Sequence, residues 1–273
     1  MKKNFSFTLI IMSIMSLGGC NGYNGLLKSN DYDAKYAAAV KYFEEGSYTR
    51  ATQLFENIQL YYHGKELAED VNWYYAQCLI KQGSYYSAAY QLNNFMRRYP
   101  YSSRAEEAAF QFAHCQYLES PEYSLDQSLT HNAVDALERF SERYPQSVHI
   151  PEVNKYLDVL RGKLMRKDYE IAVGYYNIEE YRAAYVALNE FLNNYPDSPL
   201  REDAMFYALR SAYEYGANSR KDKVKERLQV AVNDFDRFYA LFSDSKYIKQ
   251  AQKIYSDSKA IIASIEDGTY EEK

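Results

Sequence analysis

The chain has 273 residues, of which 47% are hydrophobic and 25% are charged, which is the composition of a folded globular protein and excludes general disorder. Its formal net charge of −5 offers no excess of cations for phosphate groups, which argues against nucleic acid as a partner. With only 6 prolines and 11 glycines, a turn-rich β architecture is disfavoured and an all-α fold is expected.

The N-terminal residues predict a secretory signal. Lys2 and Lys3 precede an apolar stretch over residues 5–17 that is too short to span a membrane well, and Leu17-Gly18-Gly19-Cys20 follows. This order resembles a bacterial lipobox, in which the signal is removed and the cysteine is acylated. We therefore expect a lipoprotein signal peptide over residues 1–19 and lipidation of Cys20. An ordinary signal peptide with a chance cysteine is the alternative.

The next residues predict a flexible tether. Residues 21–30 are rich in Gly, Asn and Ser, so residues 20–32 are expected to be the lipidated cysteine and a mobile linker. Asn21 follows the cysteine instead of Asp, which in lipoproteins of the enterobacterial type does not signal retention in the inner membrane. We expect the protein to be lipid-anchored at the periplasmic face of the outer membrane.

From Asp33 onward the sequence repeats a helix pair five times. In the second helix of each unit an Ala is followed by apolar residues four and seven positions later. The five copies are Ala51/Phe55/Ile58, Ala88/Leu92/Phe95, Ala133/Leu137/Phe140, Ala184/Leu188/Phe191 and Ala231/Phe235/Phe238. Helices are expected over residues 34–45 and 48–62, and over 66–81 and 85–99, with Gly46-Ser47 and Gly83-Ser84 at the turns.

Three of the units end with the pattern F-x-x-x-Y-P-x-S, which begins at Phe95, Phe140 and Phe191. Proline cannot continue a helix and pushes the residue before it out of the α region, so the pattern predicts the end of the second helix with its Phe in the core. The first and fifth units lack this proline.

The units are longer than the roughly 34 residues of an undecorated tetratricopeptide repeat. We expect an insertion near residues 119–130, a long helix over about 151–176 and a capping helix over 247–265. The expected fold is an all-α superhelical solenoid of five tetratricopeptide-like helix pairs plus a C-terminal capping helix. Repeats 1–3 occupy residues 33–145, repeats 4–5 and the cap occupy 146–266, and residues 267–273 form a disordered tail.

The sequence contains no recognisable catalytic or metal-binding motif. The four histidines lack metal-ligand spacing, and adjacent acidic pairs on a helix point to different faces. We expect no enzyme activity, no metal and no cofactor beyond the lipid on Cys20. Cys78 and Cys115 occupy equivalent repeat positions, too far apart for a disulfide, and are expected to be small buried residues.

Apolar residues at helical spacing along the first helices predict a peptide-binding stripe, consistent with an extended peptide as guest. The stripe comprises Tyr36, Phe43, Trp73, Ile80, Phe110 and Tyr117. The alternative is that these rings pack inside the solenoid or between repeats. Replacement of Trp73 and Phe110 by Ser separates the two, because only the core role predicts a loss of helix content.

A basic cluster, residues 219–227, offers a second surface. It can dock an acidic partner or phospholipid head groups, or it can be a solvated loop and helix start.

Together with the lipobox and the length, two segments give a resemblance to a known family. Phe95-Met96-Arg97-Arg98-Tyr99-Pro100 with Ser102, and Tyr195-Pro196-Asp197-Ser198 leading into Asp203-Ala204, are similar to the BamD family of outer-membrane assembly lipoproteins. The resemblance implies a non-catalytic subunit of the β-barrel assembly machinery that binds a BamA-like barrel protein, other lipoproteins of the machinery and unfolded outer-membrane proteins. It also implies a partner-docking surface on units four and five, with Arg182, Tyr185, Arg201, Arg220, Lys223 and Arg227.

Two other functions fit the same sequence. One is a tetratricopeptide lipoprotein scaffold for cell-envelope division or peptidoglycan synthesis. The other is a glycan-binding uptake lipoprotein, consistent with the 31 tyrosines.

Overall fold

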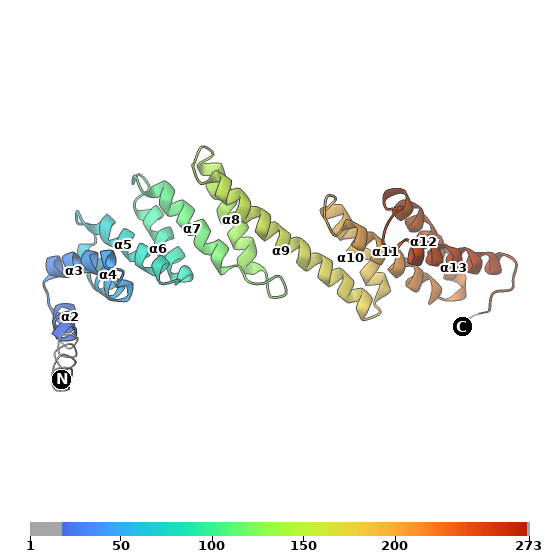
Figure 1. Ribbon diagram of the computed structural model, residues 1–273, viewed down its shortest axis with the longest axis horizontal. Helices are drawn as coiled ribbons and strands as arrows, with labels where there is room; N and C mark the ends of the chain where they lie inside the picture. The colour runs from blue at the N-terminus through green and yellow to red at the C-terminus, as the bar shows by residue number, and fades with distance from the viewer. Residues whose placement is uncertain (1–17, 272–273) are drawn as a thin grey trace, which may run out of the picture. The chain divides into compact units, whose positions relative to one another are not determined.

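A computed structural model describes residues 18–271, and within them every regular element is an α-helix (Figure 1). After α2 (Gly18–Lys28), five helix pairs and a final helix follow. The pairs are α3 (Tyr32–Glu44) with α4 (Tyr48–Tyr62), α5 (Ala68–Lys81) with α6 (Tyr85–Arg98), α7 (Ala105–Glu119) with α8 (Ser128–Arg143), α9 (Ile150–Asn177) with α10 (Tyr181–Asn194), and α11 (Arg201–Ala217) with α12 (Lys221–Leu241); α13 (Ile248–Glu266) ends the series. Because neighbouring helices along the chain pack on one another, the predicted solenoid of tetratricopeptide-like pairs is confirmed.

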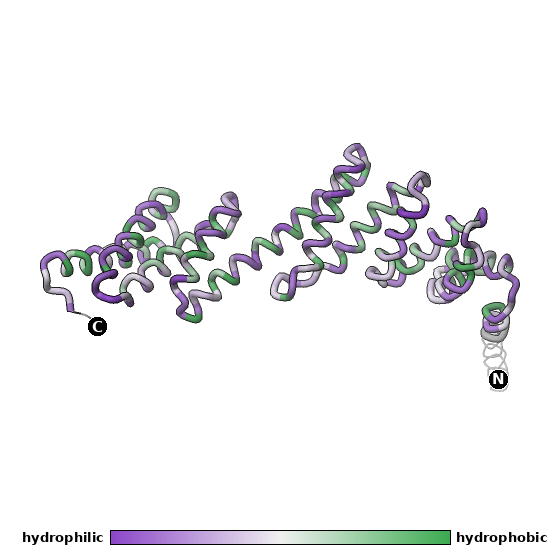
Figure 2. Tube along the Cα trace, turned by 180° about the vertical axis from the view of Figure 1, so that it is seen from behind, coloured by the Kyte–Doolittle hydropathy of each residue, from purple (hydrophilic) through white to green (hydrophobic). Residues whose placement is uncertain are grey.

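The repeated apolar positions form the core. All members of the five Ala/apolar/apolar copies are buried, and Phe95, Phe140 and Phe191 are among them. Polar residues occupy the other faces of the same helices, so apolar and polar stretches alternate along the chain trace in Figure 2. The pattern of an Ala followed by apolar residues four and seven positions later therefore predicted the core positions of each unit.

The turns inside three of the five pairs contain a residue with a left-handed backbone. Gly46 and Gly83 have φ of 75° and 72°, values that glycine adopts without steric cost. The fourth pair has the same turn but places Glu179 at that position, with φ of 65°. The glycine that predicts the turn from sequence is therefore present in the first two units, and in the fourth unit a strained glutamate takes its place.

The F-x-x-x-Y-P-x-S pattern ends one helix and begins the next. The backbone N–H groups of Tyr99, Tyr144 and Tyr195 each donate to the backbone carbonyl of the Phe four residues earlier. The serine hydroxyl then accepts a hydrogen bond from the N–H two residues later, as in Arg104 N to Ser102 Oγ at 3.0 Å. The fifth unit keeps this geometry without proline, because Ser245 Oγ accepts from Tyr247 N at 2.9 Å.

The contacts divide the chain into two compact units. Unit 1 contains residues up to 121 and 126–160, and unit 2 contains 122–125 and the residues from 161 onward. The long helix α9, predicted over 151–176, supplies residues to both: Val153, Leu157 and Leu160 to a core of unit 1, and Tyr169, Ala172 and Val173 to a core of unit 2.

The predicted insertion is a loop over residues 120–127 between α7 and α8. Lys167 Nζ, on α9, donates to the carbonyl oxygens of Ser124 and Leu125 at 3.2 and 2.8 Å. The loop is therefore attached to α9 within unit 2.

The structure differs from the sequence prediction at both ends. The segment expected to be a flexible tether forms helix α2, because Tyr23 donates to Gln53 Oε1 at 2.6 Å and, with Leu26 and Leu27, packs on the first core. The tail expected to be disordered begins with a turn at residues 267–268, and Tyr270 packs against the core cluster that contains Ile262. The signal-peptide prediction falls largely on residues 1–17, outside the described residues, as do the Cys20 side chain and residues 272–273.

Among residues 18–271, no helix is both long enough and apolar enough to cross a bilayer.

Candidate binding surfaces

The predicted peptide-binding stripe lies at the contacts between helix pairs. Tyr36 and Phe43 are half-buried in the first core, with the Phe43 ring centre 5.7 Å from that of Tyr48 and 5.2 Å from that of Tyr74. Trp73 lies 5.5 Å from Phe95, and Ile80 packs in the same core. These four side chains therefore pack within and between the first two repeats.

The stripe in the third unit is packed still more closely. Phe110 is 7% exposed, and its ring stacks on His149 at 3.8 Å between ring centres. Tyr117 stacks on Tyr156 of α9 at 4.2 Å. These contacts favour the packing role of the stripe, and peptide binding by its residues stays a prediction.

The predicted partner-docking residues fall into two groups. Tyr185 is half-buried beside Asp234 on α12, and Arg201 donates to the Pro196 carbonyl at 3.1 Å; both lie near one groove of unit 2. Arg182 is exposed on the same helix as Tyr185.

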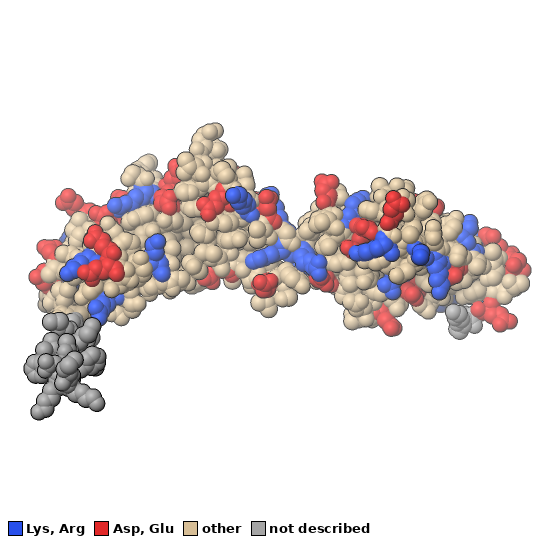
Figure 3. Space-filling view, viewed as in Figure 1, with Lys and Arg blue, Asp and Glu red and all other residues tan. Residues whose placement is uncertain are grey.

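The second group lies at the start of α12. Arg220 pairs with Asp222 at 3.1 Å, Lys223 pairs with Glu226 at 3.0 Å, and the Arg227 guanidinium lies 4.2 Å from the ring centre of Tyr215. Along α12, Asp234 lies about 10 Å beyond Arg227 and about 20 Å beyond Arg220, at roughly 1.5 Å per residue. Nearby acids neutralise much of the predicted basic cluster, and on the face in Figure 3 cationic and anionic side chains are interspersed.

Open grooves occur at three equivalent junctions. In each, the second helices of two successive pairs form the walls, and the first helix between them forms the floor. They are the α4–α6 groove of about 240 Å³, the α6–α8 groove of about 390 Å³ and the α10–α12 groove of about 320 Å³. The repeat pattern in the sequence does not predict these grooves.

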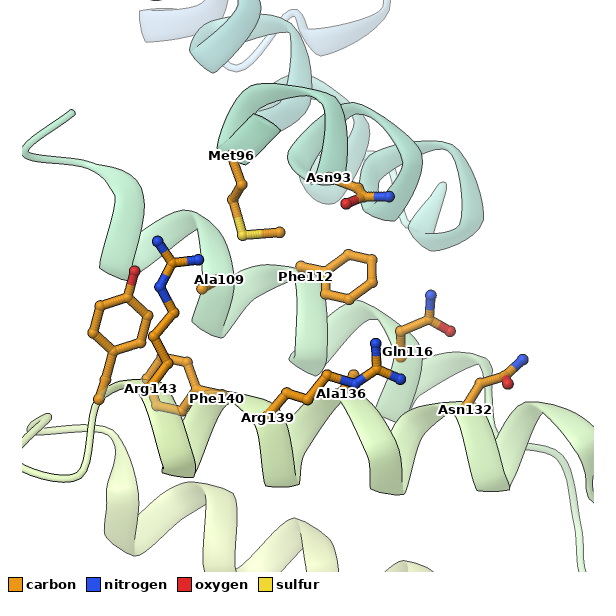
Figure 4. Close-up of a pocket in the computed structure, with 11 residues that line it drawn as sticks. Asn93, Met96, Ala109, Phe112, Gln116, Asn132, Ala136, Arg139, Phe140 and Arg143 are labelled. Atoms are coloured by element: carbon orange, nitrogen blue, oxygen red, sulfur yellow. The ribbon is translucent and has the colours of Figure 1, made fainter. Parts of the chain in front are cut away.

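The α6–α8 groove has a largely apolar interior and one cationic wall. Met96 of α6 and Phe112 of α7 point into it, and Arg139 and Arg143 extend from α8 (Figure 4). Phe112 lies on the opposite side of α7 from Phe110, which packs on α9. One helix therefore uses one face for repeat packing and another for an open surface.

The α10–α12 groove contains an ion pair whose carboxylate is buried and whose guanidinium is largely exposed. Asp234, 7% exposed, pairs with Arg237, and its second carboxylate oxygen has no hydrogen-bond partner among the described residues. Burial raises the pKa of Asp234, although the Arg237 guanidinium opposes this effect. Burial also raises the pKa of Tyr185, and the nearby Asp234 carboxylate adds to the increase.

The α4–α6 groove has a polar floor. Asn72 is buried, donates to the Ala68 carbonyl at 2.6 Å and accepts from Gln59 Nε2 at 2.7 Å. The exposed rings of the neighbouring helix face, Tyr86 and Tyr90, are 76% and 63% exposed.

A sequence signal for the grooves does exist. In the α6–α8 and α10–α12 grooves, the second wall carries the residues that lie four positions and one position before the core Phe of that helix. These residues are Ala136 and Arg139 on α8, and Asp234 and Arg237 on α12. These positions alternate with core positions and resemble ordinary surface residues unless the stacking of the next helix is known.

The described residues show little reactive chemistry. No group of three or more His, Cys, Asp or Glu side chains among them is arranged to hold a metal ion. Cys78 and Cys115 are buried free thiols, and burial raises their pKa values to about 11 and about 12. The prediction that they are buried and unbridged is confirmed.

Stacked helix pairs with grooves between successive second helices define an all-α repeat protein whose surfaces are suited to binding other chains. The chain matches YfiO, a family of outer membrane lipoproteins, over residues 28–228 and again over 172–271. It therefore belongs to this family, and the resemblance to the BamD family is confirmed. No curated protein shows significant similarity to the chain.

Proposed function

We propose that the protein is a non-catalytic subunit of the β-barrel assembly machinery, anchored by lipid on Cys20 at the periplasmic face of the outer membrane. It binds a BamA-like barrel protein, unfolded outer-membrane protein segments and other lipoproteins of the machinery. The observation that carries this proposal is the family match, which spans the five helix pairs and α13.

The geometry supports a role in binding. Within unit 1, grooves of the same kind occur at two successive junctions, so this unit can hold more than one segment. We assign the barrel-protein contact to unit 2, where Arg182 is exposed and Tyr185 and Arg201 lie near the α10–α12 groove.

The test is affinity purification of the tagged full-length protein from detergent-solubilised outer membranes, followed by mass spectrometry. A BamA-like protein is expected in roughly equimolar amount. Recovery of cell-wall synthases or a glycan transporter in its place would refute the proposal and leave the fold unchanged.

A charge-reversal variant then tests the docking surface. Arg182→Glu is expected to reduce recovery of the barrel protein, because reversal of a charge at an interface opposes association. Lys249→Glu, an exposed position on α13, is the matched control. Equal recovery with both variants would move the contact away from Arg182.

Glycan binding is the second candidate, favoured by the exposed rings of Tyr86 and Tyr90 beside the amide-lined α4–α6 groove. Titration of soluble oligosaccharides against the Tyr86→Ala/Tyr90→Ala variant tests it. Binding that is absent, or that survives both substitutions, would exclude this surface as a glycan site.

A further inference from the structure

The α6–α8 groove carries positive charge that no acid within it neutralises. Arg139 and Arg143 line it, and no Asp or Glu does. Arg139 pairs outside the groove with Asp135 at 3.4 Å, and both side chains are largely exposed, so the pair contributes little and exchanges easily. Arg143 lies 5.3 Å from the ring centre of Tyr144 at the end of the same wall.

The interior of this groove is largely apolar. Met96, Ala109, Phe112, Ala136 and Phe140 contribute to it, and Met96 and Phe112 are only partly buried (Figure 4). A methionine beside an aromatic ring adapts to different apolar side chains. The volume of about 390 Å³ falls within the range of roughly 300–1,000 Å³ for ligand sites.

Amide side chains edge the groove. Asn93, Gln116 and Asn132 line it, and none of their side chains forms a hydrogen bond within residues 18–271. Amides offer both donors and acceptors, which matches the N–H and C=O groups of an extended peptide backbone.

The two equivalent grooves lack this combination. In the α10–α12 groove, Asp234 occupies the position of Ala136 and pairs with Arg237. In the α4–α6 groove, Asn72 occupies the position of Ala109 and its amide is already hydrogen-bonded. The three grooves thus use equivalent repeat positions, but they differ in the charge of the lining side chains and in whether their amide groups are already hydrogen-bonded.

We propose that the α6–α8 groove binds an extended acidic peptide segment. An apolar side chain of the segment packs on Met96 and Phe112, its carboxylates pair with Arg139 and Arg143, and its backbone meets the amides. This inference goes beyond the proposed function, because it requires no barrel-assembly partner.

The test measures fluorescence anisotropy of labelled peptides with the purified full-length protein in detergent. The probe is Ser-Asp-Leu-Asp-Phe-Glu-Ser. One comparison peptide carries Asn and Gln in place of the acids, and another carries Ser in place of Leu and Phe. The acidic apolar probe is expected to bind about tenfold or more tightly than either, and to weaken with salt.

Three variants locate the site. Arg139→Glu/Arg143→Glu is expected to weaken binding about tenfold or more. Lys81→Glu/Arg97→Glu changes the net charge equally at exposed positions that do not line the groove, and is expected to bind as the parent does. Ala136→Gln fills the groove without adding charge and is expected to abolish binding. It should fold, because Gln91 occupies the equivalent position on α6.

Four results would overturn the proposal: no binding of the acidic probe, equal binding of the neutral peptide, equal loss in both double charge variants, or unchanged binding by Ala136→Gln. A fifth is self-association in sedimentation that Arg139→Glu/Arg143→Glu abolishes, since a second copy would then occupy the groove. Because the assay uses purified components, its failure would leave the co-purification test of the proposed function unaffected.

Discussion

At Glu179 a glutamate occupies a backbone position that the first two repeats give to glycine. Its φ of 65° matches the 75° and 72° of Gly46 and Gly83. A residue with a Cβ pays a steric cost in this region, and the neighbouring Glu180 has an ordinary φ of −79°.

Glu179→Gly is therefore expected to stabilise the protein by about 0.5–1 kcal/mol, after the greater unfolded-state entropy of glycine is subtracted. Chemical denaturation measures the change. Glu180→Gly is the control and is expected to give no gain. A lower stability of the Glu179→Gly variant would show that the side chain makes a contact outweighing the backbone strain.

His114 links stability to pH. Its ring stacks on Tyr156 at 5.0 Å, and burial lowers its pKa below the usual 6.5, although the charge of Glu152 opposes this effect. Below pH 6.5 His114 is protonated in the unfolded chain more readily than in the folded chain, which favours unfolding. The contribution of neutral His114 to the free energy of unfolding is therefore fully present above pH 6.5 and is lost as the pH falls.

His114→Phe keeps an aromatic ring in the stack and removes the titratable imidazole. The variant is expected to lose less stability than the parent between pH 7.5 and about pH 5, as measured by urea denaturation at each pH. An identical loss in both proteins would assign the pH dependence to other groups.

At the scale of elements, the repeated serine joins one helix to the next. Ser102 Oγ accepts from the Arg104 N–H at 3.0 Å and donates to Glu69 Oε1 at 2.7 Å, while the adjacent Ser103 is exposed. Ser245 does the same with Tyr247 and Glu202, so the contact recurs in unit 2.

Ser102→Ala is expected to cost about 1–2 kcal/mol of unfolding free energy, because one backbone donor and one carboxylate lose their partner. Ser103→Ala is expected to change stability by less than about 0.5 kcal/mol. Equal effects in thermal denaturation would show that the turn does not depend on this hydroxyl.

The stripe on the first helices gives a second prediction at this scale. Phe110→Ala is expected to destabilise the protein by about 3–5 kcal/mol, because its buried ring contacts both Phe140 and His149. Tyr101→Ala, at a side chain that is 99% exposed, is expected to be nearly neutral in the same denaturation experiment. A fully folded and stable Phe110→Ala protein would restore the binding interpretation of the stripe.

The helices could be predicted because each carries its own local signals. The observed ends of α4, α5 and α6 lie within two residues of the prediction, since glycine, serine and proline define them locally. The use of the stripe could not be predicted, because spacing shows that Phe110 and Tyr117 share a helix face but not that His149 and Tyr156 cover it.

At the scale of the whole molecule, the repeat number and the capping helix followed from the sequence, and the grooves did not. A groove forms where two second helices stand apart over a first helix, which depends on stacking between units. The prediction of a flexible tether was wrong for a related reason. Its Gly and Asn content predicts flexibility, but Tyr23, Leu26 and Leu27 pack on the first repeat.

This docked segment has a consequence for the proposed membrane anchor. Tyr23 donates to Gln53 on α4 at 2.6 Å, and it lies three positions after Cys20, a span of at most about 11 Å. A lipid on Cys20 would therefore hold the first repeat close to the bilayer surface.

Cys20→Ser in the full-length protein is expected to abolish metabolic labelling with a palmitate analogue and to move the protein from the membrane to the soluble fraction, because the acyl chains supply the anchoring energy. Cys78→Ser, at a buried thiol whose pKa is raised to about 11, is expected to keep both the label and the membrane association. If the Cys20→Ser protein stayed in the membrane without label, protein contacts would anchor the chain and the short span to α4 would carry no membrane meaning.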